Sequence, residues 1–149
     1  MNPSAENQHE LDPGGTVLLV AEDSEYLEHM RKITQGMGYN IHACNSYAEG
    51  IRQLESRAFE FIIVGQGSRF FEGRCVLERA NEVDRRPRVL VVARSLDVVC
   101  YFEAMQLGAV DYLPEPVTVQ ELREVADAYL RHWPPPTEAE RLTEGLEPV

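Results

Sequence analysis

The chain has 149 residues, 44% of them hydrophobic, which suits a single domain with a core of its own. Its net charge of −11 argues against binding to nucleic acid or to an anionic membrane surface, because both need a basic face. The N-terminus lacks the basic and apolar stretches of a signal peptide, and no apolar run approaches the length of a membrane span. We therefore expect a cytoplasmic protein that binds neither nucleic acid nor a membrane.

The two ends of the chain differ in composition from its middle. Residues 1–15 are polar and contain no Lys or Arg, which predicts a flexible N-terminal arm. Residues 132–149 combine three successive prolines with acidic residues, which predicts an extended tail or a linker. The folded domain is expected over residues 16–131.

Short apolar runs alternate with amphipathic segments along this domain. Strands are predicted at residues 16–21, 40–44, 59–64, 88–93 and 109–113. Five helices are predicted. The first covers residues 24–37, the second begins at residue 47, the third covers residues 74–82, the fourth ends at residue 107, and the fifth begins after residue 118. The expected N-caps are Asp23 or Ser24, Ser46, Ser95 or Asp97, and Thr118. In the last helix Leu122, Val125, Ala126 and Tyr129 form one apolar stripe.

Successive strand–helix units wind right-handed into a parallel sheet with helices on both faces. The predicted fold class is α/β, a flavodoxin-like doubly wound (βα)5 three-layer sandwich. Five strands suit a parallel sheet of order 2-1-3-4-5. In such a sheet, ligands and chemistry gather just beyond the carboxyl ends of the strands.

The residues at those strand ends are unusual. Glu22 and Asp23 follow the first strand and either hold a divalent cation or serve as a solvated acid and a helix cap. The third strand ends at Gly65, which has no side chain where a working group is expected. The fourth strand ends at Ala93, and Glu115 follows the fifth.

Residues 65–68 form a glycine-rich turn, Gly-Gln-Gly-Ser. Such a turn can let backbone N–H groups approach a phosphate or flavin phosphate. The turn has no lysine nearby and lies beside several acids, so we favour a plain surface loop.

The joint spacing of these features resembles the receiver domain of two-component response regulators. The resemblance rests on the order of elements, the acidic pair, Gly73 at the start of the third helix, and residues 108–116, which read GAVDYLPEP. It covers about residues 16–131. In that family the acidic pair and a phosphoacceptor aspartate hold magnesium, and the aspartate takes a phosphoryl group from a histidine kinase. A Thr or Ser and a Lys then contact the phosphoryl oxygens.

Residue by residue, the resemblance implies a degenerate phosphorylation site. The acidic pair is retained as Glu22 and Asp23, whereas the phosphoacceptor position falls on Gly65, the Thr/Ser position on Ala93 and the Lys position on Glu115. No aspartate occurs in residues 59–73. We therefore expect no aspartyl phosphate, no catalytic residue and no cofactor. Magnesium binding should be weak or lost, the acidic pair being the weak metal candidate.

The helix that ends at Leu107 is apolar over more than one face. Either it is deeply packed, or Val98 and Tyr101 project from it as a contact patch. Receiver domains commonly dimerise or bind partners through the fourth helix, fifth strand and fifth helix. The candidate interaction face consists of Val98, Tyr101, Met105, Tyr112 and Leu122, and Tyr112 also matches the family's aromatic switch position.

These expectations describe a pseudo-receiver that is not an enzyme. It would act as a phosphorylation-independent signalling and protein-interaction module in a bacterial two-component system or phosphorelay, with a protein partner or a second copy bound. The alternatives are a small-molecule or nucleotide binder that uses the emptied crevice, and a phosphoacceptor with a substitute acid, Glu60 or Glu72. It could also be the receiver part of a larger regulator whose output domain is absent from this chain.

Overall fold

The computed structural model describes residues 15–130. The predicted arm, apart from Gly15, and the predicted tail lie outside the described residues. Within residues 15–130, no helix combines the length and the apolar character that crossing a membrane requires.

Five strands and five helices alternate along the described chain. The strands are β1 (Thr16–Val20), β2 (Asn40–Cys44), β3 (Phe61–Gly65), β4 (Arg88–Ala93) and β5 (Asp111–Pro114). The helices are α2 (Ser24–Gly36), α3 (Tyr47–Ser56), α4 (Arg74–Ala80), α5 (Val98–Gln106) and α6 (Val119–Tyr129). The strands form one parallel sheet in the order β2-β1-β3-β4-β5, which confirms the predicted fold class and strand order.

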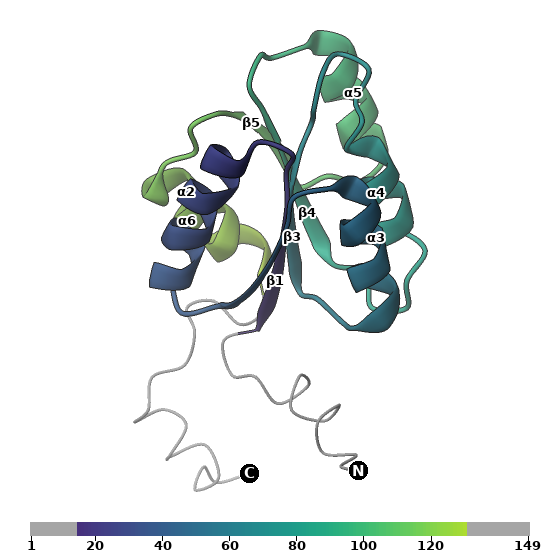
Figure 1. Cartoon of the computed structure of the whole chain (residues 1–149). Coiled ribbons are helices and arrows are strands. Elements are labelled where there is room, and N and C mark those ends of the chain that lie inside the picture. Colours follow the sequence, from purple (N-terminus) through teal and green to yellow (C-terminus); the bar gives the residue numbers. More distant parts are fainter. Residues whose placement is uncertain (1–14, 131–149) are drawn as a thin grey trace, which may run out of the picture.

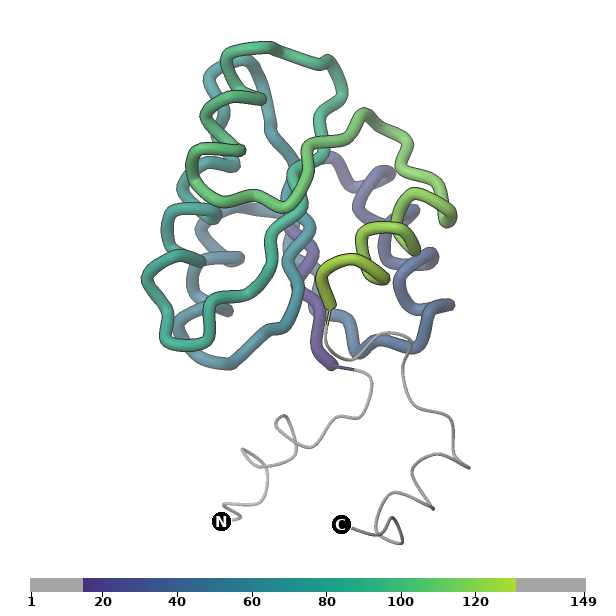
Figure 2. The backbone as a smooth tube through the Cα atoms, turned by 180° about the vertical axis from the view of Figure 1, so that it is seen from behind, coloured from purple at the N-terminus to yellow at the C-terminus, as the bar shows by residue number. Residues whose placement is uncertain are grey.

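The helices form two layers around the sheet. Helices α2 and α6 cover one face, and α3, α4 and α5 cover the other (Figure 1). The same separation is visible from behind (Figure 2). Both faces of the central strands are therefore buried, which explains why these strands read as continuous apolar runs.

Alternate residues of the central strands supply two separate cores. Leu18 and Ile62 pack with the residues of α3, α4 and α5, whereas Val17 and Ile63 pack with those of α2 and α6. All four side chains are almost completely buried. Burial of one such aliphatic side chain contributes about 1.5–3 kcal/mol to folding, so these two cores carry much of the stability.

The caps settle two choices that the sequence left open. Asp23, not Ser24, accepts hydrogen bonds from backbone N–H groups in the first turn of α2. Asp97, not Ser95, caps α5 in the same way. Thr118 caps α6 within a full capping box. Each cap stabilises its helix by about 1 kcal/mol and thereby fixes where the preceding loop ends.

Several elements differ from their predicted bounds, and one helix differs from its predicted stripe. β1 ends at Val20 and α4 ends at Ala80, each earlier than expected. β3 and β5 each begin and end later than expected, so Gly65 belongs to β3 and pairs with Val92. Ala109 is excluded from β5 because its N–H bonds back to Ala104 at the end of α5. In α6 the predicted apolar stripe is buried except for Tyr129, which is 41% exposed at the last residue of the helix.

Candidate functional site

The carboxyl ends of the central strands surround a hollow of about 690 Å³. It is lined by residues 21–23, 65–69, 72, 94–97 and 115, with Tyr47 from α3. The fold thus brings together Glu22, Asp23, Gly65 and Glu115, as the sequence predicts. Ala93 does not line the hollow, since it is completely buried at the end of β4.

Gly65 has room for a side chain. A Cβ at this position would lie 3.5 Å from the Cβ of Ala21 and 3.8 Å from the hydroxyl of Tyr47, which are ordinary contacts. The tight approach is instead at Gly73, where a Cβ would lie 2.2 Å from the carbonyl oxygen of Gly65. Glycine is therefore sterically required at the start of α4 but not at the end of β3.

The hydroxyl of Tyr47 occupies the space next to Gly65. It donates a hydrogen bond of 3.1 Å to the Gly65 carbonyl oxygen. Burial, followed by the nearby Glu22 carboxylate, raises the pKa of Tyr47 well above its usual range. The phenol thus stays protonated as a donor toward the backbone of β3.

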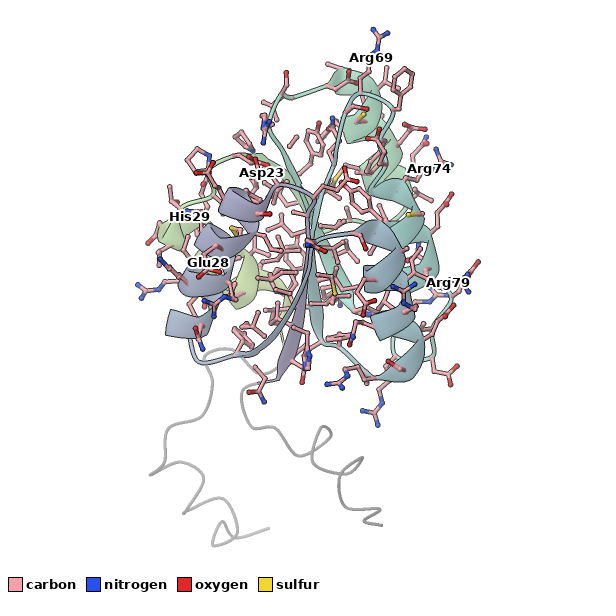
Figure 3. The ribbon with its side chains drawn as sticks, in the orientation of Figure 1. Asp23, Glu28, His29, Arg69, Arg74 and Arg79 are labelled. Carbon is pink, nitrogen blue, oxygen red and sulfur yellow. The ribbon has the colours of Figure 1, made fainter. Side chains whose placement is uncertain are left out.

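Arg94 supplies a positive charge within the acidic crevice. Its guanidinium pairs with the Asp23 carboxylate, and its Nε lies 3.9 Å from Oε1 of Glu115. Figure 3 shows Asp23 at the start of α2, on the rim of the sheet. The sequence prediction gives Arg94 no role. A signal was available, because this arginine directly follows one strand while acids follow two other strands of the same sheet.

The acidic residues here do not fit a magnesium ion. One oxygen of Asp23 caps α2 and the other pairs with Arg94, so both already have partners. Gly65 offers no side-chain oxygen. Among residues 15–130, no three or more His, Cys, Asp or Glu side chains are arranged to hold a metal. Of the two readings of Asp23, this geometry supports the helix cap.

The surroundings of Glu115 disfavour the ionised form of its carboxyl. Burial raises the pKa of its carboxyl, and the nearby Asp23 carboxylate raises it further, while Arg94 lowers it. The net direction is upward. Desolvation therefore outweighs the partial pairing with Arg94.

A buried polar network lies beneath the same crevice. The side-chain oxygen of Gln66 accepts a hydrogen bond from the Tyr112 hydroxyl, and its NH₂ group donates to the Ser68 carbonyl oxygen at 3.1 Å. The backbone N–H of Asp97 donates to the Tyr112 hydroxyl at 3.1 Å. The sequence predicts only a surface loop at Gln66, because no local pattern marks a glutamine as buried.

The outer side of α5 is apolar and exposed. Val98 is 70% exposed and Tyr101 is 41% exposed, and only Cys100 and Ala104 of this helix are buried. We define the α5 surface as the exposed apolar residues of this helix: Val98, Val99, Tyr101, Phe102 and Met105. The account of a deeply packed helix is wrong, since the apolar side chains face outward.

Two members of the predicted interaction face lie in the core. Leu122 is 1% exposed because the buried stripe of α6 packs it against the sheet. Tyr112 is also buried, with its hydroxyl held by Gln66. Neither side chain offers a surface to a partner, so their inclusion in that face was wrong. Val98, Tyr101 and Met105 are the exposed members.

Comparison with known proteins agrees with this architecture. The family model described as the response regulator receiver domain matches residues 17–127, well over half of the chain. The photosynthetic apparatus regulatory protein RegA of Cereibacter sphaeroides is 28% identical over 131 residues, which cover 87% of this chain and 70% of RegA. The transcriptional regulatory protein ZraR of Escherichia coli O157:H7 is 24% identical over 116 residues, 78% of this chain. The chain spans only 26% of ZraR.

Solved structures show the same fold at low identity. A CheY-like receiver domain protein from Methanospirillum hungatei is 21% identical, with a TM-score of 0.69 over 76% of this chain and 90% of that one. A response regulator from Burkholderia pseudomallei, solved with a phosphorylated aspartic acid, calcium and citrate, is 19% identical. Its TM-score is 0.67, over 90% of this chain and 75% of that one. Together with the family model, the geometry establishes that this chain belongs to the response regulator receiver domain family.

Proposed function

We propose that this receiver domain is a phosphorylation-independent protein-interaction module in bacterial two-component signalling. The observation that carries the proposal is Gly65 at the carboxyl end of β3, where the family's phosphoacceptor aspartate is expected. An acyl phosphate forms on a side-chain carboxylate, and glycine has none. The relative from B. pseudomallei, by contrast, carries a phosphorylated aspartic acid.

The neighbouring residues support the same conclusion. Ala93 has no hydroxyl and is buried, so it cannot donate to a phosphoryl oxygen. Glu115 adds a negative charge where a phosphoryl group would need a positive one. Arg94 and Arg69 are the cations that line the hollow, and Arg94 pairs with Asp23. Three positions would therefore have to change before phosphotransfer became efficient.

A substitute phosphoacceptor has little support. Glu72 lines the hollow, but the hydroxyl and backbone N–H of Ser68 donate to its carboxylate and lower its pKa. Glu60 precedes β3 and therefore lies at the opposite end of the sheet from the crevice. Neither carboxylate is free at the site where phosphoryl transfer takes place in the family.

The α5 surface supports a role in protein contact. It presents several exposed apolar side chains on one helix, whereas scattered single ones would need no explanation. A protein partner that prefers one conformer of the domain can switch it without phosphoryl chemistry. The partner is another protein or a second copy, and the α5 surface is its main contact.

A second candidate function is binding of a small molecule or nucleotide, favoured by the hollow of about 690 Å³ at the strand ends. Its walls bear four acids, Glu22, Asp23, Glu72 and Glu115, but only two arginines, Arg69 and Arg94. This excess of negative charge disfavours an anionic ligand. Native mass spectrometry of the purified protein tests this candidate. A ligand that co-purifies and leaves on denaturation would support it.

The main proposal is tested with acetyl phosphate and magnesium, and separately with beryllofluoride. We expect the intact mass to stay unchanged, with no gain of about 80 Da for one phosphoryl group. We also expect no amide NMR shifts at the crevice with beryllofluoride. A phosphoryl adduct on any residue of the folded domain would overturn the proposal.

A further inference from the structure

Gln66 is a long polar side chain buried where the sheet meets the crevice. It follows β3 directly and is 2% exposed. Among residues 15–130, the only other buried polar residues are Thr16 and Thr34. Burying an amide is costly unless both its oxygen and its nitrogen are hydrogen-bonded, so the partners of Gln66 decide what it does.

Those partners determine how the amide is oriented. The Ser68 carbonyl oxygen is purely an acceptor, so it must face the NH₂ group of Gln66, 3.1 Å away. The Tyr112 hydroxyl accepts from the Asp97 N–H and directs its own proton to the side-chain oxygen of Gln66. The alternative acceptor, the Asp97 carbonyl oxygen, is farther away at 3.4 Å. The side-chain oxygen of Gln66 is therefore the acceptor for the hydrogen bond that the Tyr112 hydroxyl donates.

From Tyr112 a series of aromatic contacts reaches the protein surface. The Tyr112 ring meets the Tyr101 ring edge to face, with centroids 5.7 Å apart. The Tyr101 ring meets the Phe102 ring in the same manner at 5.4 Å. Tyr101 and Phe102 both belong to the α5 surface. The buried amide is thus connected to this exposed surface through a single intervening ring, that of Tyr112.

We propose that Gln66 is the residue that positions the α5 surface. Its hydrogen bond keeps Tyr112 packed inward, and Tyr112 in turn fixes the orientation of the Tyr101 and Phe102 rings. No phosphoryl group is needed to hold this arrangement. The biological use of the surface rests on the proposed function, but the positioning itself depends on the geometry alone.

A simpler role for Gln66 would be to close the loop after β3 through Ser68. Two substitutions separate the roles. Gln66→Leu removes both side-chain hydrogen bonds of Gln66 at similar volume. Tyr112→Phe removes the bond to Gln66 and the bond from the Asp97 N–H, but leaves the Gln66 bond to Ser68 in place. Thr34→Val is the matched control, because it removes another buried hydrogen bond, from Thr34 to the Met30 carbonyl oxygen on α2.

The test is NMR of the full chain with labelled aromatic rings. In the wild type we expect a cross-relaxation signal between the Tyr101 and Tyr112 rings. Gln66→Leu and Tyr112→Phe should each lose it and shift the Tyr101 and Phe102 ring resonances by similar amounts. The double variant should show no larger change than either single one, because both remove the same interaction. Thr34→Val should leave these signals unchanged.

An unchanged ring contact in folded Tyr112→Phe would overturn the positioning role, and this variant suffices if Gln66→Leu does not fold. If Gln66→Leu changed the signals of the Tyr101 and Phe102 rings and Tyr112→Phe did not, Gln66 would act in loop closure and the inference would be refuted. Phosphorylation by acetyl phosphate would refute the proposed function while leaving the ring contact intact. The two failures are thus distinguishable.

Discussion

The substitution Gly65→Asp returns a carboxylate to the position where the family carries its phosphoacceptor. The structure accommodates the change, since the nearest atom to the new Cβ is the Cβ of Ala21 at 3.5 Å. The backbone of Gly65 also lies outside the left-handed region that favours glycine. We therefore expect the variant to fold and to present its carboxylate to the hollow.

A carboxylate alone should not restore efficient phosphorylation. Removing one preorganised donor to transition-state charge typically slows a reaction by about 10²–10³-fold. Here the donors expected at residues 93 and 115 are both missing, and Glu115 contributes a negative charge in place of a cation. If the losses add, Gly65→Asp should react about 10⁴–10⁶-fold more slowly than a complete site. Adding Glu115→Lys should recover about 10²–10³-fold of that rate.

The assay is intact mass over time with acetyl phosphate and magnesium. Gly65→Asn serves as the matched control, because it has the same shape as aspartate but cannot form an acyl phosphate. Urea unfolding of each variant checks that the fold is kept. If Gly65→Asp alone reacted as fast as Gly65→Asp/Glu115→Lys, our account of residue 115 would be refuted.

Three further predictions concern other residues. Gly73→Ala should lower the free energy of unfolding by about 3 kcal/mol or more in urea melts, because its Cβ would overlap a backbone oxygen at 2.2 Å. The control Gly36→Ala, with nothing within 4 Å, should be neutral or stabilising by up to about 1 kcal/mol, and equal losses would contradict the overlap. Glu115→Gln should stabilise the protein near pH 7 and have little effect near pH 4. The folded state raises the pKa of Glu115, so its carboxylate lowers stability as pH rises above the ordinary carboxyl range, and a pH-independent effect would refute this. Tyr101→Glu should abolish self-association or partner binding, measured by light scattering and pull-down. The control is Tyr129→Glu, since both tyrosines are 41% exposed, and unchanged association in Tyr101→Glu would sink the contact role of the α5 surface.

The sequence predicts where the strands end because strand formation depends on neighbouring residues, and it predicts the strand order from the alternation of strands and helices. The continuous apolar run at residues 61–64 predicts a strand that is buried on both faces. Alternation of strands and helices then leaves few possible topologies. The same reasoning places Gly65 at the end of a strand that borders the crevice, and the tertiary structure adds that a side chain would fit there.

The partners of the polar residues were decided only by the tertiary structure. Arg94 meets Asp23 across 71 positions of sequence, and Gln66 meets Tyr112 across 46. No local pattern distinguishes these pairs from the other acids and hydroxyls available nearby. The exposure of α5 is a similar case, because an apolar helix reads alike whether it is fully packed or presents one side to a partner. Helix and strand formation follow from neighbouring residues, whereas burial and pairing depend on which loops the folded sheet brings to one edge.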